Sequence, residues 1–341
     1  IDALAVSLAP GRLRFTAVSR LQALERPAGA PPFTARTAFA ALGGDPDEAA
    51  ALAASLTHVA ARVLERATAR GLRAVPLGHP DYPPLLARLA DAPAVLWVRG
   101  EAAALALPAV AVVGSRAASP EGLRAARILG EDLAAAGVLV VSGLARGVDA
   151  AAHEGALVSG RTVAVLGCGV DVAYPAEHAD LSSRVAGTGA VVAEFPPGTA
   201  PRAHHFPLRN RIISGLSLAT VVVEAAERSG ALITARTALD QGREVMAMPA
   251  AVAGGRNRGA HGLIRDGALL VESAADVLDA LRLLPRADPG PSSVPPATAP
   301  DDEILRALTP GVAEAVDALA ARTAWAVPAL LARLATLEID G

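Results

Sequence analysis

The sequence predicts an α/β protein whose main domain is a doubly wound parallel sheet with helices on both faces. Short β-branched apolar runs alternate with helical stretches along the middle of the chain, which is the pattern of βαβ units. Alanine- and leucine-rich helical pieces precede this region, and a proline-rich tether with short helical pieces follows it. We therefore expect a small helical domain, the sheet domain and a small helical module, in that order.

Residues 1–73 are predicted to form the helical domain. Their longest helical piece, 47–70, opens with Asp47, and an acidic side chain favours a helix N-terminus. The next segment, 74–107, is dense in proline and contains one short apolar run, 94–98. We expect an ordered connector there that carries a single edge strand.

Residues 108–284 are predicted to form the sheet domain. Seven apolar runs have the length and β-branched content of buried strands: 110–113, 138–141, 162–166, 190–193, 220–223, 244–247 and 268–271. Helical stretches separate most of them: 121–136, 149–159, 177–186, 232–241 and 274–283. Because parallel strands place their carboxyl ends at one edge, loops that follow the strands are expected to form the ligand site.

The C-terminal part divides into a tether and a module. Residues 285–300 are proline-rich, which predicts an extended, semi-rigid linker. Helical pieces are predicted at 301–308, 312–323 and 327–338. Three short helices are compatible with a helix-turn-helix or winged-helix module.

Composition limits the possible functions. The chain has 341 residues, a net charge of −3, and 31 basic residues that are all arginine. A nucleic-acid partner would therefore need a local basic patch. The single cysteine, Cys168, excludes an intrachain disulfide and a multi-cysteine zinc site and fits a reducing compartment. No apolar run reaches membrane length, so we expect a cytoplasmic protein.

The most informative stretch is Glu194–Ser217, which lies between two predicted strands. It contains no acidic residue after Glu194 and carries five basic or imidazole side chains, Arg202, His204, His205, Arg209 and Arg211. The Arg-Asn-Arg triplet 209–211 is expected to open a short helix, whose free N–H groups favour an anion. The alternative is a proline-rich crossover with solvated arginines. The position at the ligand edge favours the anion site.

Three other loops follow predicted strands at the same edge. Val112–Arg116 ends in Gly-Ser-Arg, which offers close backbone approach and phosphate ligands. Ser142–Asp149 is a glycine-rich strand-to-helix turn of the phosphate-cradle type, although it matches neither a dinucleotide fingerprint nor a P-loop. Gly167–Pro175 contains Tyr174, which could stack on a base or cap its loop.

No catalytic or metal-binding constellation is evident in the sequence. The candidate bases are His153, His204, His205 and His261, and the candidate acids are Asp149, Glu194 and Glu224, but their spacing matches no metal motif. Glu224 follows its strand directly, so it could be catalytic or could cap the backbone of a neighbouring loop. Cys168 has no nearby base and is expected to be an inert thiol.

Taken together, these loops resemble the DprA/Smf family of DNA-processing proteins. The matching stretches occur in family order: Val112–Arg116, Ser142–Asp149, Gly167–Pro175, Glu194–Ser217, Val222–Ala235, Gly242–Pro249 and Leu263–Ala268. The resemblance implies an extended Rossmann-like core without catalytic activity or cofactor. It also implies a SAM-like helical domain before the core and a winged-helix module after it. Two departures, Ala250 for glycine and His261 for asparagine, affect the loop 250–261.

The resemblance also implies a function in natural transformation and DNA recombination. Such a protein would bind and protect single-stranded DNA, load the RecA recombinase and form a homodimer. The expected DNA-binding residues are Gly114, Ser115, Arg116, Ser142, Gly143, Arg146, Gly147, Arg209, Asn210 and Arg211. Ile233 and Thr237, on one side of the predicted helix 232–241, are the expected dimer contacts, whereas Leu232, Ala235 and Leu239 form the other apolar stripe.

Two enzyme classes are the alternatives. A nucleotide-processing Rossmann enzyme, such as a phosphoribohydrolase, would use Glu224 and an arginine, but the Pro-Gly-Gly-x-Gly-Thr loop of those enzymes is absent. A dinucleotide-dependent oxidoreductase is disfavoured because its glycine fingerprint is missing.

Overall fold

The computed structural model describes residues 1–9, 35, 39, 45–283, 307, 316–323 and 325–340. The chain divides into two compact units, Ile1–Leu284 and Pro285–Gly341, which are described separately. Within the described residues, no helix is both long and apolar enough to cross a membrane.

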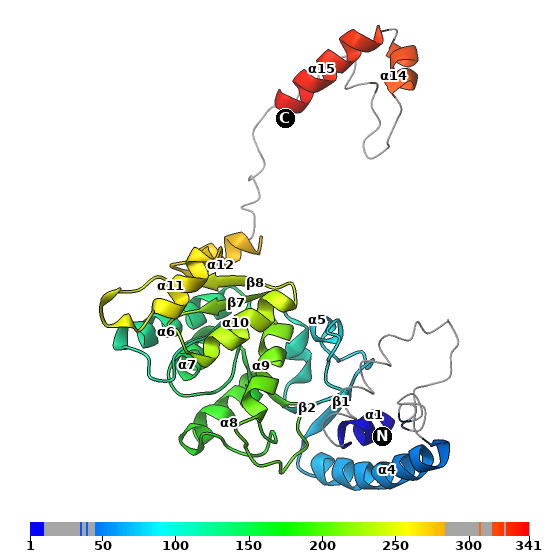
Figure 1. The fold of residues 1–341 in the computed structure, drawn as a ribbon, viewed down its shortest axis with the longest axis vertical. Coiled ribbons are helices and arrows are strands. Elements are labelled where there is room, and N and C mark those ends of the chain that lie inside the picture. Colours follow the sequence, from blue (N-terminus) through cyan, green and yellow to red (C-terminus); the bar gives the residue numbers. More distant parts are fainter. Residues whose placement is uncertain are drawn as a thin grey trace. The chain divides into compact units, whose positions relative to one another are not determined.

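The first unit is built on one nine-stranded sheet (Figure 1). Its strands are β1 Arg73–Pro76, β2 Val95–Gly100, β3 Ala109–Val113, β4 Leu139–Ser142, β5 Thr162–Leu166, β6 Ala190–Ala193, β7 Ala219–Val222, β8 Glu244–Ala247 and β9 Leu269–Leu270. The order across the sheet is β1-β2-β6-β5-β4-β3-β7-β8-β9. The seven strands from β6 to β9 are parallel, and β1 and β2 are added antiparallel at one side. The doubly wound parallel core is therefore confirmed, with the order reversing between β3 and β7.

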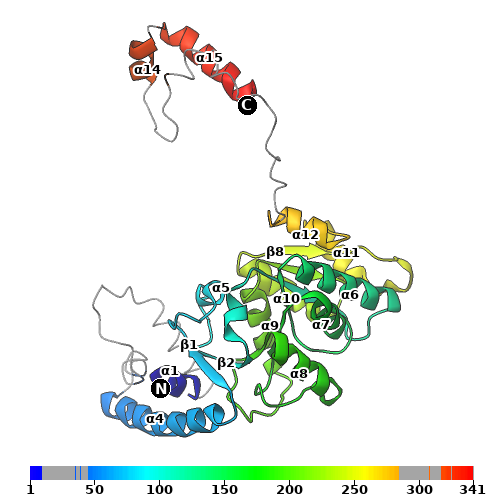
Figure 2. The same cartoon turned by 180° about the vertical axis from the view of Figure 1, so that it is seen from behind.

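Helices cover both faces of this sheet, as Figures 1 and 2 show from opposite sides. Apolar residues of α5 Pro84–Ala87, α9 His205–Gly215, α10 Gly230–Asp240 and α11 Arg258–Arg265 pack on one face. The other face is covered by α1 Asp2–Ser7, α4 Pro46–Thr68, α6 Pro120–Ala135, α7 Val148–Ser159, α8 Ala179–Thr188 and α12 Ala274–Ala280. Short 3₁₀ turns lie at Ala102–Ala106, Ala176–His178 and Ala253–Gly255.

The prediction of a single edge strand in the connector was wrong. The run near 94–98 is β2, and it pairs on both sides, with β1 and with β6. Its side chains are buried from Val95 to Val98. The strand outside it, β1, is only four residues long and ends in a proline, so its sequence carries a weak strand signal. The connector therefore extends the core sheet.

The second unit contains α14 Val316–Thr323 and α15 Val327–Asp340 among its described residues. Leu319, Ala320 and Leu330 form a small buried cluster between them. The predicted helix 301–308 lies outside the described residues except for Ala307, and so do residues 285–300 and 312–315.

Candidate nucleic-acid interface

A cleft opens at the carboxyl edge of the sheet, where β3 and β7 lie side by side. Chain connections leave these two strands in opposite directions, and such a switch point is where open α/β sheets bind ligands. The cleft has a volume of about 830 Å³. Its lining includes Gly114–Ala117 after β3, most of residues 226–234 after β7, and part of α9 with the loop before it.

The Gly-Ser-Arg loop forms one wall of this cleft. Gly114 packs so closely that a Cβ there would lie 2.6 Å from Val148 and 3.0 Å from the carbonyl oxygen of Glu224. Ser115 N–H donates to that same carbonyl at 2.7 Å. The loop is thus fixed on the end of β7, and Arg116 projects from it with an exposed side chain.

Glu224 holds the far end of the same loop. Its buried carboxylate accepts from Ser119 N–H at 3.1 and 3.2 Å and from the Ser119 hydroxyl at 2.5 Å. Ser119 in turn caps α6 by accepting from Gly122 N–H at 3.0 Å. Of the two roles that the sequence left open for Glu224, the structure therefore supports the loop cap.

We expect Glu224→Gln to change the affinity of the cleft for its ligand by less than about threefold, because an amide oxygen of the same shape still accepts from Ser119. Glu224→Ala removes the acceptor and should weaken binding more, by loosening the loop that carries Arg116. Fluorescence anisotropy with a labelled oligonucleotide measures both. Equal losses in the two variants would mean that the charge of Glu224, rather than its shape, matters.

The glycine-rich turn Ser142–Asp149 does not offer a free phosphate cradle. The carboxylate of Asp149 accepts from the backbone N–H groups of Gly143, at 3.1 Å, and Ala145, at 3.3 Å. Gly147, with φ of 77°, fits against the carbonyl oxygen of Ser115, which a Cβ would approach to 2.2 Å. Two backbone donors of the turn are therefore used within the turn itself, and the turn joins the Gly-Ser-Arg loop to α7.

Arg209 lies buried beneath this turn, at the base of the cleft. Its Nη1 donates to the carbonyl oxygens of Gly143, at 2.6 Å, and Val165. Gly143 is needed here, because a Cβ would lie 2.3 Å from that nitrogen. Burial lowers the pKa of Arg209 to about 10, and the nearby charge of Asp149 opposes the shift, so the guanidinium is charged at neutral pH. Arg209 is almost fully buried, yet it contributes to the lining of the cleft.

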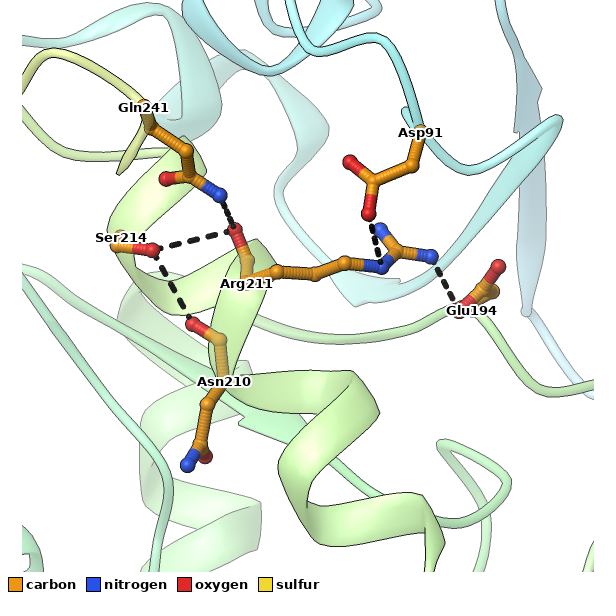
Figure 3. A network of polar contacts seen from close by, with 6 residues as sticks. All are labelled: Asp91, Glu194, Asn210, Arg211, Ser214 and Gln241. Carbon is orange, nitrogen blue, oxygen red and sulfur yellow. Dashed lines mark hydrogen bonds and ion pairs between the residues drawn. The ribbon is translucent and has the colours of Figure 1, made fainter. Parts of the chain in front are cut away.

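The structure places Arg211 away from the cleft, contrary to the sequence prediction. Figure 3 shows its side chain directed between Asp91 and Glu194. Nη2 lies 2.8 Å from the Glu194 carboxylate, and Nε lies 3.3 Å from that of Asp91. The side chains of Arg211 and Glu194 are only 7% and 3% exposed. Arg211 therefore ties α9 to β6 and to the connector, and we do not retain it as a phosphate ligand.

The error has a local cause. Helix α9 begins at His205, so the Arg-Asn-Arg triplet lies one turn inside the helix instead of at its N-terminus. Pro207 falls in the first turn of α9, where a missing N–H costs nothing. Successive residues then project in different directions, and Asn210 is the member of the triplet that lines the cleft together with Arg209.

Two aromatic rings add an apolar wall to the cleft. The sequence indicated Tyr174 as a residue that could stack on a base, but it gave no prediction for Phe206. The rings of Tyr174 and Phe206 lie 5.3 Å apart, and the Arg116 guanidinium lies 5.6 Å from the centre of the Phe206 ring. Tyr174 is 42% exposed, so its ring is accessible at the rim. The only sequence signal that Phe206 lines the cleft is its position beside the basic residues of the 194–217 stretch.

The remaining predicted DNA-binding residues lie outside the lining of the cleft. Ser142 is fully buried and its hydroxyl donates to the carbonyl oxygen of Val112 at 2.6 Å. Arg146 is exposed and forms an ion pair with Glu177 beside a smaller cavity of about 280 Å³ that adjoins Arg116 and Arg209. Ser142 and Gly147 shape the edge of the sheet, and neither lines the cleft.

The predicted dimer contacts lie on α10, but one of them also belongs to the cleft. Ile233 is 45% exposed and lines the cleft wall, whereas Thr237 is half-buried and donates to the Ile233 carbonyl at 2.9 Å. The buried face of α10 consists of Ala231, Thr234, Ala235 and Ala238. Leu239, expected on a packed stripe, is 57% exposed.

Two of the candidate bases, His153 and His205, and the thiol of Cys168 are buried in packing roles. His153 is fully buried against the Thr162 hydroxyl at 2.7 Å, and burial lowers its pKa to about 3. His205 is buried with Nδ1 3.0 Å from the Gly167 carbonyl. Burial raises the pKa of Cys168 to about 11, so the thiol is protonated at neutral pH and a poor nucleophile. In the described part of the chain, no group of three or more potential ligands is arranged for a metal ion.

Comparisons with known proteins agree with this architecture. Residues 73–282 match the family model for DNA recombination-mediator protein A, and residues 288–341 match the DprA winged helix domain. Protein Smf of Escherichia coli is 44% identical over 276 residues, which is 78% of this chain and 74% of that protein. The DNA processing protein DprA of Streptococcus pneumoniae is 44% identical over 198 residues, covering 58% of this chain and 70% of that one.

Two solved structures are similar. That of DNA processing protein A from Streptococcus pneumoniae has a TM-score of 0.70 at 32% identity and covers 81% of this chain and 95% of that chain. That of DNA processing protein A from Helicobacter pylori, described for its single-stranded DNA binding mode, has a TM-score of 0.57 at 26% identity. It covers 62% of this chain and 95% of that chain.

Proposed function

Since the chain belongs to the DprA/Smf family of DNA-processing proteins, we propose that its cleft binds single-stranded DNA, mainly through the phosphate backbone. The observation that carries this proposal is the pairing of an exposed guanidinium, Arg116, with a buried one, Arg209, at the switch point of the sheet. Arginine forks suit phosphate oxygens, and the rings of Tyr174 and Phe206 offer stacking surfaces that do not select a sequence.

The wider role follows from the same proposal. The protein would protect single-stranded DNA in the cytoplasm and load the RecA recombinase on it during natural transformation and recombination. It would do so without catalysing a reaction. In support, each of the three candidate acids is engaged in holding structure: Asp149 by backbone N–H groups, Glu194 by Arg211, and Glu224 by Ser119.

A gel-shift series tests the proposed function. The protein should retard single-stranded oligonucleotides at concentrations where it leaves duplexes of the same length free. The affinity should fall steeply with salt, because bound phosphates release counterions. Incubation with nucleoside monophosphates should release no base. Base release that depends on Glu224 would instead support a phosphoribohydrolase, and equal retardation of both DNA forms would contradict single-strand selectivity.

We also propose that the protein is a homodimer formed through the C-terminal half of the core. Two phosphate sites on one dimer would raise the apparent affinity for a long strand without new contacts. Thr237→Glu is the better test of this interface, since Ile233 also lines the cleft. The parent should have a dimeric mass by light scattering and Thr237→Glu a monomeric one, with weaker binding to long oligonucleotides. A monomeric parent at micromolar concentration would exclude the dimer.

A further inference from the structure

The loop between β8 and α11, residues 250–257, is the part of the ligand edge that the proposed function leaves unassigned. It is the yellow loop that projects beside α6 in Figure 1. Buried Asn257 anchors its end by accepting from Ala225 N–H at 3.0 Å and donating to the Met248 carbonyl at 3.0 Å. The loop is thereby fixed to the ends of β7 and β8, the strands beside the cleft.

The two departures from the family pattern, Ala250 at the start of this loop and His261 in α11, contact each other. The backbone N–H of Ala250 donates to Nε2 of His261 at 3.3 Å, so the histidine closes the start of the loop. The first N–H groups of α11, those of Gly259 and Ala260, donate to the Ala225 carbonyl at 2.8 and 3.2 Å. The base of the loop therefore has its own hydrogen bonds, and its outer part is free to carry exposed side chains.

Arg256 is the charged side chain by which this loop contacts a residue of the cleft wall, Ala117. It is exposed, and its Nη1 donates to the Ala117 carbonyl at 3.3 Å. Ala117 follows Arg116 in the chain and lines the cleft. Among the described residues, no carboxylate lies within ion-pair distance of Arg256, and the nearby Glu227 lies 3.9 Å from Arg258. Arg256 therefore adds an uncompensated positive charge beside Arg116.

We propose that Arg256 is a further phosphate ligand, which binds the strand where it leaves the cleft past Arg116. This inference rests on the proposed binding of single-stranded DNA and extends the site beyond the cleft itself. A guanidinium that uses one nitrogen on a carbonyl keeps other donors for a phosphate oxygen. The phosphate backbone is continuous, so when one phosphate is bound at Arg116, the neighbouring phosphates of the strand lie along the rim of the cleft, within reach of Arg256.

The competing explanation is that Arg256 only braces the Gly-Ser-Arg loop through Ala117. The two roles differ in their dependence on oligonucleotide length. A phosphate ligand outside the cleft acts only on strands long enough to reach it. A brace acts on every strand, because it shapes the cleft.

The test measures the binding of labelled oligothymidylates of three to twenty nucleotides to the full chain, by anisotropy at several salt concentrations. Arg256→Ala should lower the affinity for the longest strand about tenfold and reduce the slope of log affinity against log salt concentration by about 0.7. The affinity for the shortest strand that the parent protein binds should not change. Arg256→Lys should keep the slope, since an ammonium still neutralises a phosphate. Arg265→Ala, which removes an exposed charge at the C-terminal end of α11, should change neither quantity.

Equal losses at all lengths would overturn the proposal in favour of a brace, and an unchanged affinity for long strands would overturn it outright. A parent that binds no single-stranded DNA at any length would instead contradict the proposed function. The two failures are therefore distinguishable.

Discussion

Replacing Glu194 by alanine is expected to lower the free energy of unfolding of the first unit by about 3 to 5 kcal/mol. The substitution leaves the nearly buried guanidinium of Arg211 without the carboxylate that lies 2.8 Å from it. Asp91 cannot replace it, because its side chain is 49% exposed and solvent screens its charge. An uncompensated buried charge is costly, whereas an intact buried pair contributes little net stability.

Denaturant unfolding measures this change. The chain has two tryptophans, and Trp97 is fully buried in β2, so its fluorescence in a Trp325→Phe background reports on the first unit alone. Asp91→Ala is the matched control and should cost about 1 kcal/mol or less, as exposed ion pairs do. If Glu194→Ala were as stable as Asp91→Ala, loss of the buried carboxylate would not be costly, and the expectation would be wrong.

Replacing Arg116 by alanine is expected to weaken single-stranded DNA binding by about 1 to 3 kcal/mol, the range for a lost charged hydrogen bond. The side chain is exposed on a loop that Glu224 and Ser115 fix at both ends, so its loss should leave the fold intact. The salt slope should fall by about 0.7, the value for one phosphate on a single strand.

Two other variants complete this experiment. Arg184→Ala, on α8 and outside the cleft, removes the same charge and should leave the affinity unchanged. Arg211→Ala should lower stability without changing the salt slope, because the structure places that side chain against Glu194. If the salt slope of DNA binding fell in Arg211→Ala but not in Arg116→Ala, Arg211 and not Arg116 would be the phosphate ligand.

The sequence was sufficient for features that depend on local pattern. The parallel strands and the ligand edge follow from apolar runs whose period and flanking turns are visible in the chain. The Gly-Ser-Arg loop was placed correctly for the same reason, since it directly follows β3. Strand β1 was missed because four residues that end in proline are a weak signal, and pairing with β2 decides its structure.

Side-chain partners across the fold were not predictable in the same way. The residues around Asp149 in the sequence do not indicate that its carboxylate accepts hydrogen bonds from the backbone of its own turn. The sequence likewise does not indicate that Arg211 pairs with a carboxylate 17 positions earlier. The direction of each arginine side chain depends on where α9 begins. The helix begins at His205, several residues before the predicted start at Arg209, and Arg211 therefore points away from the cleft. Helix boundaries are uncertain by several residues in sequence analysis, which is enough to change the direction of a side chain.

Photocrosslinking shows whether the switch-point cleft holds the single strand. An oligothymidylate with photoreactive bases is irradiated on the full chain, and the modified residues are mapped by mass spectrometry. We predict that the crosslinks concentrate on Tyr174 and Phe206 and disappear in Arg116→Ala at equal DNA concentration. Crosslinks confined to Pro285–Gly341, with none on the cleft, would mean that the cleft does not hold the strand.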